Sequence, residues 1–136
     1  MNRPLKFRVW DIEQNKFLPS YADKGIEFYH EQGKDWHEKQ VRDIVPVSWF
    51  LQYHNNNLGN YIVDEYTGLN DKNGKEIYEG DILEWKGEFI AEVFFEQENA
   101  AFVSKSKKGG SFMSENYVLN FQIIGNIFEH KHLLEN

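Results

Sequence analysis

The chain has 136 residues, of which 40% are hydrophobic and 16% aromatic, and this aromatic content excludes a chain that is disordered throughout. It contains no cysteine, which excludes a disulfide-stabilised secreted domain and favours a reducing cytoplasm. Its net charge of −7 disfavours binding to nucleic acid, because an acidic surface repels phosphate. At the N-terminus a basic start is followed by no apolar stretch, and no apolar run is long enough for a bilayer, so we expect neither a signal peptide nor a membrane segment.

The first half of the chain predicts short strands and polar loops. Lys6 to Trp10 alternates polar and apolar residues, as a half-buried strand does, and Phe17-Leu18 forms the returning strand of a hairpin. Ile26 to Tyr29 has strand character, and the polar stretch from His30 to Arg42 is either a long loop or an irregular hairpin. Val47 to Tyr53 is aromatic and β-branched, so it is predicted to be a further strand.

In the second half, strands are predicted at short intervals. They cover residues 61–63, 82–85, 89–95, 101–103, 117–119 and 121–124. Asn73-Gly74 is the strongest turn signal, and a type I′ hairpin at this point requires φ > 0 at both residues. Gly109-Gly110 is predicted to lie in a flexible loop, and Glu129 to Glu135 to form a short final helix.

Together these elements predict a mainly β protein with two subdomains. Residues 1–66 would form an N-terminal β-hairpin subdomain with variable polar loops. Residues 67–136 would form a small SH3-like β-barrel, because their short strands and tight turns follow one another at near-regular spacing.

Three stretches carry a longer pattern: residues 6–11, residues 66–82, and residues 123–129 with Leu133-Leu134-Glu135 behind them. The middle one, Tyr-Thr-Gly-Leu-Asn-Asp-Lys-Asn-Gly-Lys-Glu-Ile-Tyr-Glu-Gly-Asp-Ile, is long and specific. In these stretches the chain resembles the YopX family of small phage and prophage proteins of Gram-positive bacteria. The resemblance implies a β-rich fold and a homo-oligomer such as a hexamer, and it implies no activity and no functional residue.

The middle stretch contains five candidate structural or interaction residues, which are Asn73, Gly74, Tyr78, Gly80 and Asp81. Asn73-Gly74 would set a hairpin register, and Gly80 would let the chain turn sharply into the next strand. Asp81 would accept hydrogen bonds from turn amides. We predict that the stretch is structural, with a binding loop as the alternative.

Enzyme and metal chemistry have little support in the sequence. Glu76, Glu79 and Asp81 lie close together, and paired carboxylates can act as acid and base, but surface acids are the simpler interpretation. His130 and His132 would share one face of a strand, yet no third ligand accompanies them. No nucleotide-binding glycine pattern and no serine-hydrolase motif occurs. We therefore expect no catalytic residue, no cofactor and no bound metal.

A basic cluster, Lys105, Lys107 and Lys108, follows the acidic stretch from Glu76 to Glu98 and is the candidate interaction surface. It is either a solvated loop tip, or a surface that meets the acidic stretch of a second copy, or, with nearby aromatic rings, a platform for nucleic acid. Our leading hypothesis is a non-catalytic, self-associating phage accessory protein of the host cytoplasm that contacts itself and phage or host proteins. A nucleic-acid-binding module that uses these lysines is the alternative, and an enzyme is the third possibility.

Overall fold

The computed structural model describes residues 6–21, 25–32, 39–45 and 59–135, and it describes side chains in residues 6–19 and 59–135. The fold is mainly β, as predicted, with antiparallel sheets and one short α-helix. The chain forms two compact units, unit 1 (Met1–Lys6 and Asp64–Asn136) and unit 2 (Phe7–Val63). It passes from unit 2 into unit 1 within strand β6 (Tyr61–Asn70), which also contains the boundary expected at residue 66.

Unit 2 contains the N-terminal hairpin, and its prediction is confirmed. Strand β1 (Phe7–Asp11) pairs antiparallel with β2 (Lys16–Phe17), with Trp10 opposite Phe17. The two rings pack edge to face with centroids 4.8 Å apart. The Asp11 carboxylate closes the turn by accepting the Gln14 N–H at 3.0 Å.

Unit 2 also contains a three-stranded sheet in the order β3-β4-β5. Its strands are β3 (Ser20–Tyr21), β4 (Gly25–Gln32) and β5 (Lys39–Val45). The register of β4 and β5 runs from Ile26 opposite Val45 to Gln32 opposite Lys39. The described ends of the predicted stretch, residues 30–32 and 39–42, therefore lie in paired strands, as the hairpin alternative predicted. The strand predicted from Val47 to Tyr53 lies wholly within residues 46–58, outside the described part of the chain.

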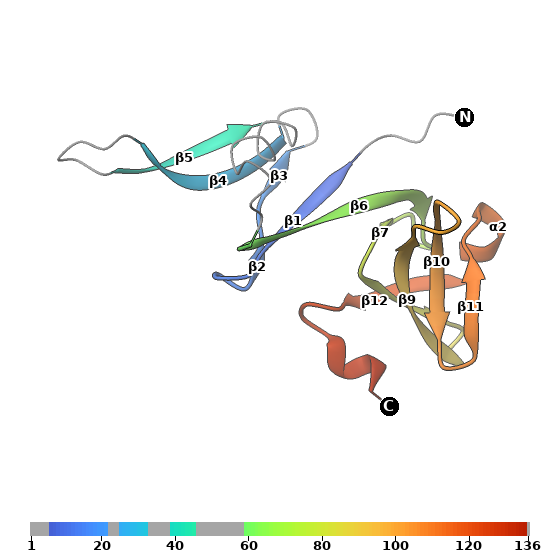
Figure 1. The fold of residues 1–136 in the computed structure, drawn as a ribbon. Coiled ribbons are helices and arrows are strands. Elements are labelled where there is room, and N and C mark those ends of the chain that lie inside the picture. Colours follow the sequence, from blue (N-terminus) through green and yellow to red (C-terminus); the bar gives the residue numbers. More distant parts are fainter. Residues whose placement is uncertain (1–5, 22–24, 33–38, 46–58, 136) are drawn as a thin grey trace. The chain divides into compact units, whose positions relative to one another are not determined.

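Unit 1 is built on a five-stranded antiparallel sheet that curls into a half-barrel, with the order β11-β10-β9-β8-β12 (Figure 1). The strands are β8 (Asp81–Trp85), β9 (Phe89–Glu96), β10 (Ala101–Ser106), β11 (Gly109–Phe112) and β12 (Phe121–Asn126). β6 pairs with the short strand β7 (Glu76–Tyr78) beside them. The core of unit 1 contains the buried residues Ile77, Leu83, Val93, Val118 and Phe121.

Residues 117–119, predicted as a strand, instead end the helix α2 (Glu115–Val118), so that prediction is wrong. Ser114 begins the helix as its N-cap, because its hydroxyl accepts the Tyr117 N–H at 3.2 Å. The Tyr117 hydroxyl then lies 2.6 Å from that of Ser104 on β10, and Val118 is buried in the core. A helix can direct the consecutive residues Tyr117 and Val118 toward the same core, whereas a strand would point them to opposite faces.

Two other sequence predictions change in unit 1. Gly109-Gly110 begins strand β11, in register with Ser106 and Lys105 of β10, and is not a loop. The C-terminal helix is a single 3₁₀ turn, η1 (Lys131–Leu134), within the predicted span. No helix in residues 6–21, 25–32, 39–45 and 59–135 is long and apolar enough to cross a membrane.

The turn at Asn73-Gly74 exists, but the predicted type I′ geometry is wrong. Gly74 has φ +80°, whereas Asn73 does not have a positive φ. The Gly74 N–H donates to the Asp71 carbonyl at 2.9 Å, so the turn spans Asp71 to Gly74 and the left-handed glycine is its last residue. This is the geometry of a longer hairpin loop, in which a turn ends on one left-handed residue.

Candidate functional site

Asp71 organises the turn between β6 and β7 and joins it to the edge of the five-stranded sheet. Its side chain is buried, and Oδ1 accepts the N–H groups of Asn73 and Lys75, each at 2.9 Å. Oδ2 accepts the N–H of Ile123 on β12, also at 2.9 Å. Three backbone donors thus satisfy a carboxylate that would otherwise be costly to bury.

Gly80 and Asp81 make the entry into β8. Gly80 has φ +81°, donates its N–H to Val93 at 2.9 Å and accepts the Ile127 N–H at 2.8 Å. Asp81 is 2% exposed, and its Oδ2 accepts the Tyr78 N–H at 2.8 Å. Each of these residues has a structural contact, so the middle stretch holds β7, β8, β9 and the end of β12 together.

The third stretch of the pattern forms a compact turn after β12. Asn126 Oδ1 accepts the N–H groups of Phe128 and Glu129, each at 3.0 Å. The backbone N–H of Asn126 in turn donates to Nδ1 of His130 at 3.2 Å. The His130 ring lies directly over Gly125, where a Cβ would stand 2.5 Å from Nδ1, so only glycine fits beneath it.

The carboxylates considered for catalysis all have partners within the fold. Glu76 Oε2 lies 2.5 Å from Nζ of Lys6, and this contact raises the pKa of Lys6. Glu79 Oε1 accepts the N–H of Glu65 at 3.1 Å, and Asp81 is bonded as described above. Three carboxylates that are close in sequence are thus directed to three different contacts, and they do not converge on one cavity.

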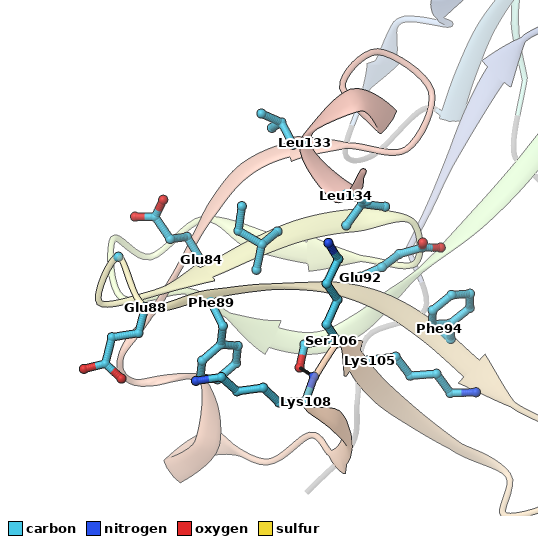
Figure 2. A pocket seen from close by; sticks show the side chains of 13 residues that line it. Glu84, Glu88, Phe89, Glu92, Phe94, Lys105, Ser106, Lys108, Leu133 and Leu134 are labelled. Carbon is cyan, nitrogen blue, oxygen red and sulfur yellow. Dashed lines mark hydrogen bonds between the residues drawn. The ribbon is translucent and has the colours of Figure 1, made fainter. Parts of the chain in front are cut away.

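A groove of about 590 Å³ lies on unit 1 and is the candidate functional site (Figure 2). It is lined from four elements, β8, β9, β10 with its turn into β11, and η1. The lining residues are Glu84, Gly87, Glu88, Phe89, Ile90, Glu92, Phe94, Lys105, Ser106, Lys107, Lys108, Leu133 and Leu134. The structure therefore brings the three candidate lysines together with three glutamates of the acidic stretch in one groove.

Acidic and basic side chains are interspersed in this groove, because Glu92 lies opposite Lys105 in the pairing of β9 with β10. In Figure 2, Glu84 and Glu88 lie toward the left, with Phe94 and Lys105 toward the right. Among the described residues, none of the three candidate lysines forms an ion pair with a carboxylate. Instead Lys105 Nζ lies 5.3 Å from the centroid of the Phe94 ring, and Lys108 Nζ lies 5.6 Å from that of Phe89. Opposite charges are thus available in the groove to a molecule that enters it.

Among the residues that line the groove, Glu92 has a pKa that its surroundings shift. Burial raises its pKa above the ordinary value, and the positive charge of Lys131 on η1 opposes that change. In the antiparallel pairing of β9 with β10, Lys105 lies opposite Glu92. A half-buried carboxylate with a raised pKa makes the charge of the groove sensitive to acid.

Within the described residues, His130 and His132 meet no third side chain that could complete a metal site. Their ring centroids are 6.4 Å apart, and Nδ1 of His130 already accepts the Asn126 N–H. No group of three His, Cys, Asp or Glu residues that could hold a metal occurs in the part of the chain that the structure describes.

Sequence reasoning missed two residues that organise the fold, Asp71 and His130. Asp71 is not among the predicted site residues, although an aspartate two residues before Asn-Gly is itself an Asx-turn signal. The packing of His130 on Gly125 left no comparable local signal, because it depends on how the chain turns after β12. The groove itself also went unpredicted, since η1 meets β9 only through the tertiary fold.

Comparisons with known proteins include one matching family model and two solved structures of similar fold. A family model described as YopX protein matches residues 6–135. The solved structure of protein EF1440 from Enterococcus faecalis is similar at a TM-score of 0.53 and 22% identity, covering 98% of this chain and 99% of that one. The structure of protein yopX from Bacillus subtilis is similar at a TM-score of 0.51 and 15% identity, with the same coverage. No curated protein matches the chain.

Proposed function

This chain belongs to the YopX family, and from that premise we propose that it is a non-catalytic phage accessory protein that acts by self-association and by contacts with phage or host proteins. We place it in the cytoplasm of the host bacterium, and we propose that its C-terminal half is an SH3-like barrel module. The molecule would act through the surface that it presents, because membership of the family implies no activity.

The observation that carries the proposal is exposed apolar surface on the five-stranded sheet and the helix beside it. Phe94, Phe95, Phe112 and Leu119 have exposed fractions of 38%, 40%, 61% and 64%. Large apolar side chains exposed at several places on one small unit would be covered if another protein bound there. The engaged carboxylates of Glu76, Glu79 and Asp81 support a non-catalytic role, since a general acid or base must reach a substrate.

Self-association is tested by light scattering on the full chain over a range of concentrations. We expect a mass that is a multiple of 16.2 kDa at micromolar concentration. A mass of one chain at every concentration, up to the solubility limit, would refute the proposal.

Nucleic-acid binding remains the second candidate, and the stacking of Lys105 on Phe94 and of Lys108 on Phe89 favours it. Against it, Glu84, Glu88 and Glu92 line the same groove and would repel a phosphate backbone. If it were correct, single-stranded DNA would bind with an affinity that falls steeply with salt.

The discriminating variant changes Lys105, Lys107 and Lys108 together to Glu. It should abolish DNA binding if the second candidate is correct, and should weaken the oligomer if the lysines meet acidic residues of a partner subunit. A matched control changes the exposed residues Lys16, Lys72 and Lys75 to Glu, which alters the net charge equally at other sites. We expect a weaker oligomer with the first variant and an unchanged one with the control.

A further inference from the structure

Strand β11 is an uncovered edge of the five-stranded sheet. It is last in the strand order, and all four of its residues, Gly109 to Phe112, are exposed. An exposed edge offers unpaired N–H and C=O groups to another strand. It is also short, and at Gly110 it carries no side chain that would hinder an approaching backbone.

The opposite edge of the same sheet is covered. Along β12, the Phe121 carbonyl accepts the N–H of Lys72 at 2.9 Å, and the Ile123 N–H donates to Asp71. The turn between β6 and β7 therefore covers one edge and leaves β11 as the edge that can accept a strand.

The hydrogen bonds of β11 fix which of its backbone groups are available. The Met113 N–H, one residue beyond β11, donates to Phe102 of β10, and Ser104 lies opposite Ser111. In an antiparallel pair the hydrogen-bonding direction alternates along the strand. The backbone groups of Ser111 thus point toward β10, and those of Gly110 and Phe112 point outward.

We propose that β11 pairs antiparallel with β11 of a second copy about a two-fold axis through Ser111. In this register Gly110 of each copy lies opposite Phe112 of the partner subunit, so that all outward N–H and C=O groups of these residues are paired. Ser111 faces its own equivalent as a pair without hydrogen bonds. An isologous contact of this kind closes on itself and does not continue into a fibre.

Side chains on either side of β11 suit this register. Phe112, which is 61% exposed, would lie across from a glycine, a pairing in which an aromatic ring covers the backbone of the opposite strand. The antiparallel direction brings the turn that carries Lys107 in one copy to the same end of the paired strands as Glu115 of the partner subunit, and the same holds at the other end by symmetry. Lys107 and Glu115 are respectively in the turn before β11 and at the start of α2, so the complementary charges flank the paired strands.

The inference rests on the proposed function, since it names the surface by which the chain would self-associate. Ser111→Cys tests the register directly, because the chain has no other cysteine. Residues opposed without hydrogen bonds in antiparallel strands have Cα atoms about 4.5 Å apart, within the range that a disulfide spans. We expect oxidised Ser111→Cys to become a covalent dimer, and the control Asn116→Cys, also exposed, to remain largely uncrosslinked.

A second pair of variants tests the edge in solution without relying on oxidation. Phe112→Lys places a charge on β11 and should weaken association about tenfold or more. Ile12→Lys introduces the same charge at another exposed apolar residue, in unit 2 and outside the edge, and should leave association unchanged. If the wild type is oligomeric but Ser111→Cys does not crosslink and Phe112→Lys associates normally, the β11 register is wrong and self-association stands. If the wild type is monomeric and Ser111→Cys does not crosslink, both are wrong.

Discussion

The contact between Gly125 and His130 leads to a prediction that the structure specifies in detail. A Cβ at Gly125 would stand 2.5, 2.6 and 2.8 Å from Nδ1, Cγ and Cβ of His130, whereas carbon atoms normally approach to about 3.5 Å or more. Gly125→Ala must therefore displace the imidazole, including its attachment point, by about 1 Å.

The expected loss of stability follows from this displacement. Forcing extra volume into a packed site costs about 1–3 kcal/mol, and moving the ring also weakens the 3.2 Å hydrogen bond from Asn126 to Nδ1. We expect Gly125→Ala to lower the free energy of unfolding by about 2 kcal/mol.

The assay is a double-mutant cycle in urea at one fixed protein concentration. His130→Ala removes the atoms that the new Cβ would meet, so Gly125→Ala should cost much less in the His130→Ala background than in the wild type. We expect a coupling energy of about 1–2 kcal/mol. If Gly125→Ala costs the same in both backgrounds, the steric explanation is wrong.

The remaining predictions concern the turn and the groove. Gly74 has φ +80°, and a Cβ added there would meet no atom within 4 Å, so a substitution acts through backbone strain alone. Gly74→Val should lower the free energy of unfolding by about 1–3 kcal/mol and Gly74→Asn by less. Equal melting temperatures for the two variants would show that this strain is absent. Asp71→Ala should cost about 2–4 kcal/mol and Asp71→Asn less, because the amide retains one acceptor oxygen; urea titration measures both, and no loss in Asp71→Ala would contradict its role. Glu92 has a raised pKa in the fold, so its ionisation opposes folding as the pH rises above about 4.5, its ordinary value. Glu92→Gln should therefore raise the melting temperature at pH 7 more than at pH 4, and an equal shift at both pH values would contradict the burial effect.

The strands of unit 1 could be predicted where local alternation and turn residues coincide, as in β8 and β9. Lys86 and Gly87 turn the chain between them at φ +48° and +72°, and the sequence marks such a turn clearly. Tyr117 to Leu119 was assigned wrongly for a physical reason. A hydrophobic run of three residues has no period, and the decisive features were the Ser114 cap and the contact of Tyr117 with Ser104 across the sheet.

The candidate site was predictable only in its parts. The lysines and the acidic stretch are visible in the sequence, and both contribute to the groove. Their meeting depends on the register that sets Lys105 opposite Glu92, and on the contact of η1 with β9. Neither is encoded in a short segment, because register and docking are decided by packing over the whole sheet.

The two oxygens of the Asp71 carboxylate also differ in when they can find their partners during folding. Oδ1 meets amides that are 2 and 4 positions away, whereas Oδ2 meets one that is 52 positions away. Closing a loop of that length costs about 3–4 kcal/mol of chain entropy beyond a constant. The local half of the arrangement can therefore form early, and the other half must wait for β12 to arrive. Loss of the long-range half should then act mainly on the rate of unfolding, which makes this one carboxylate a determinant of how long the folded molecule persists.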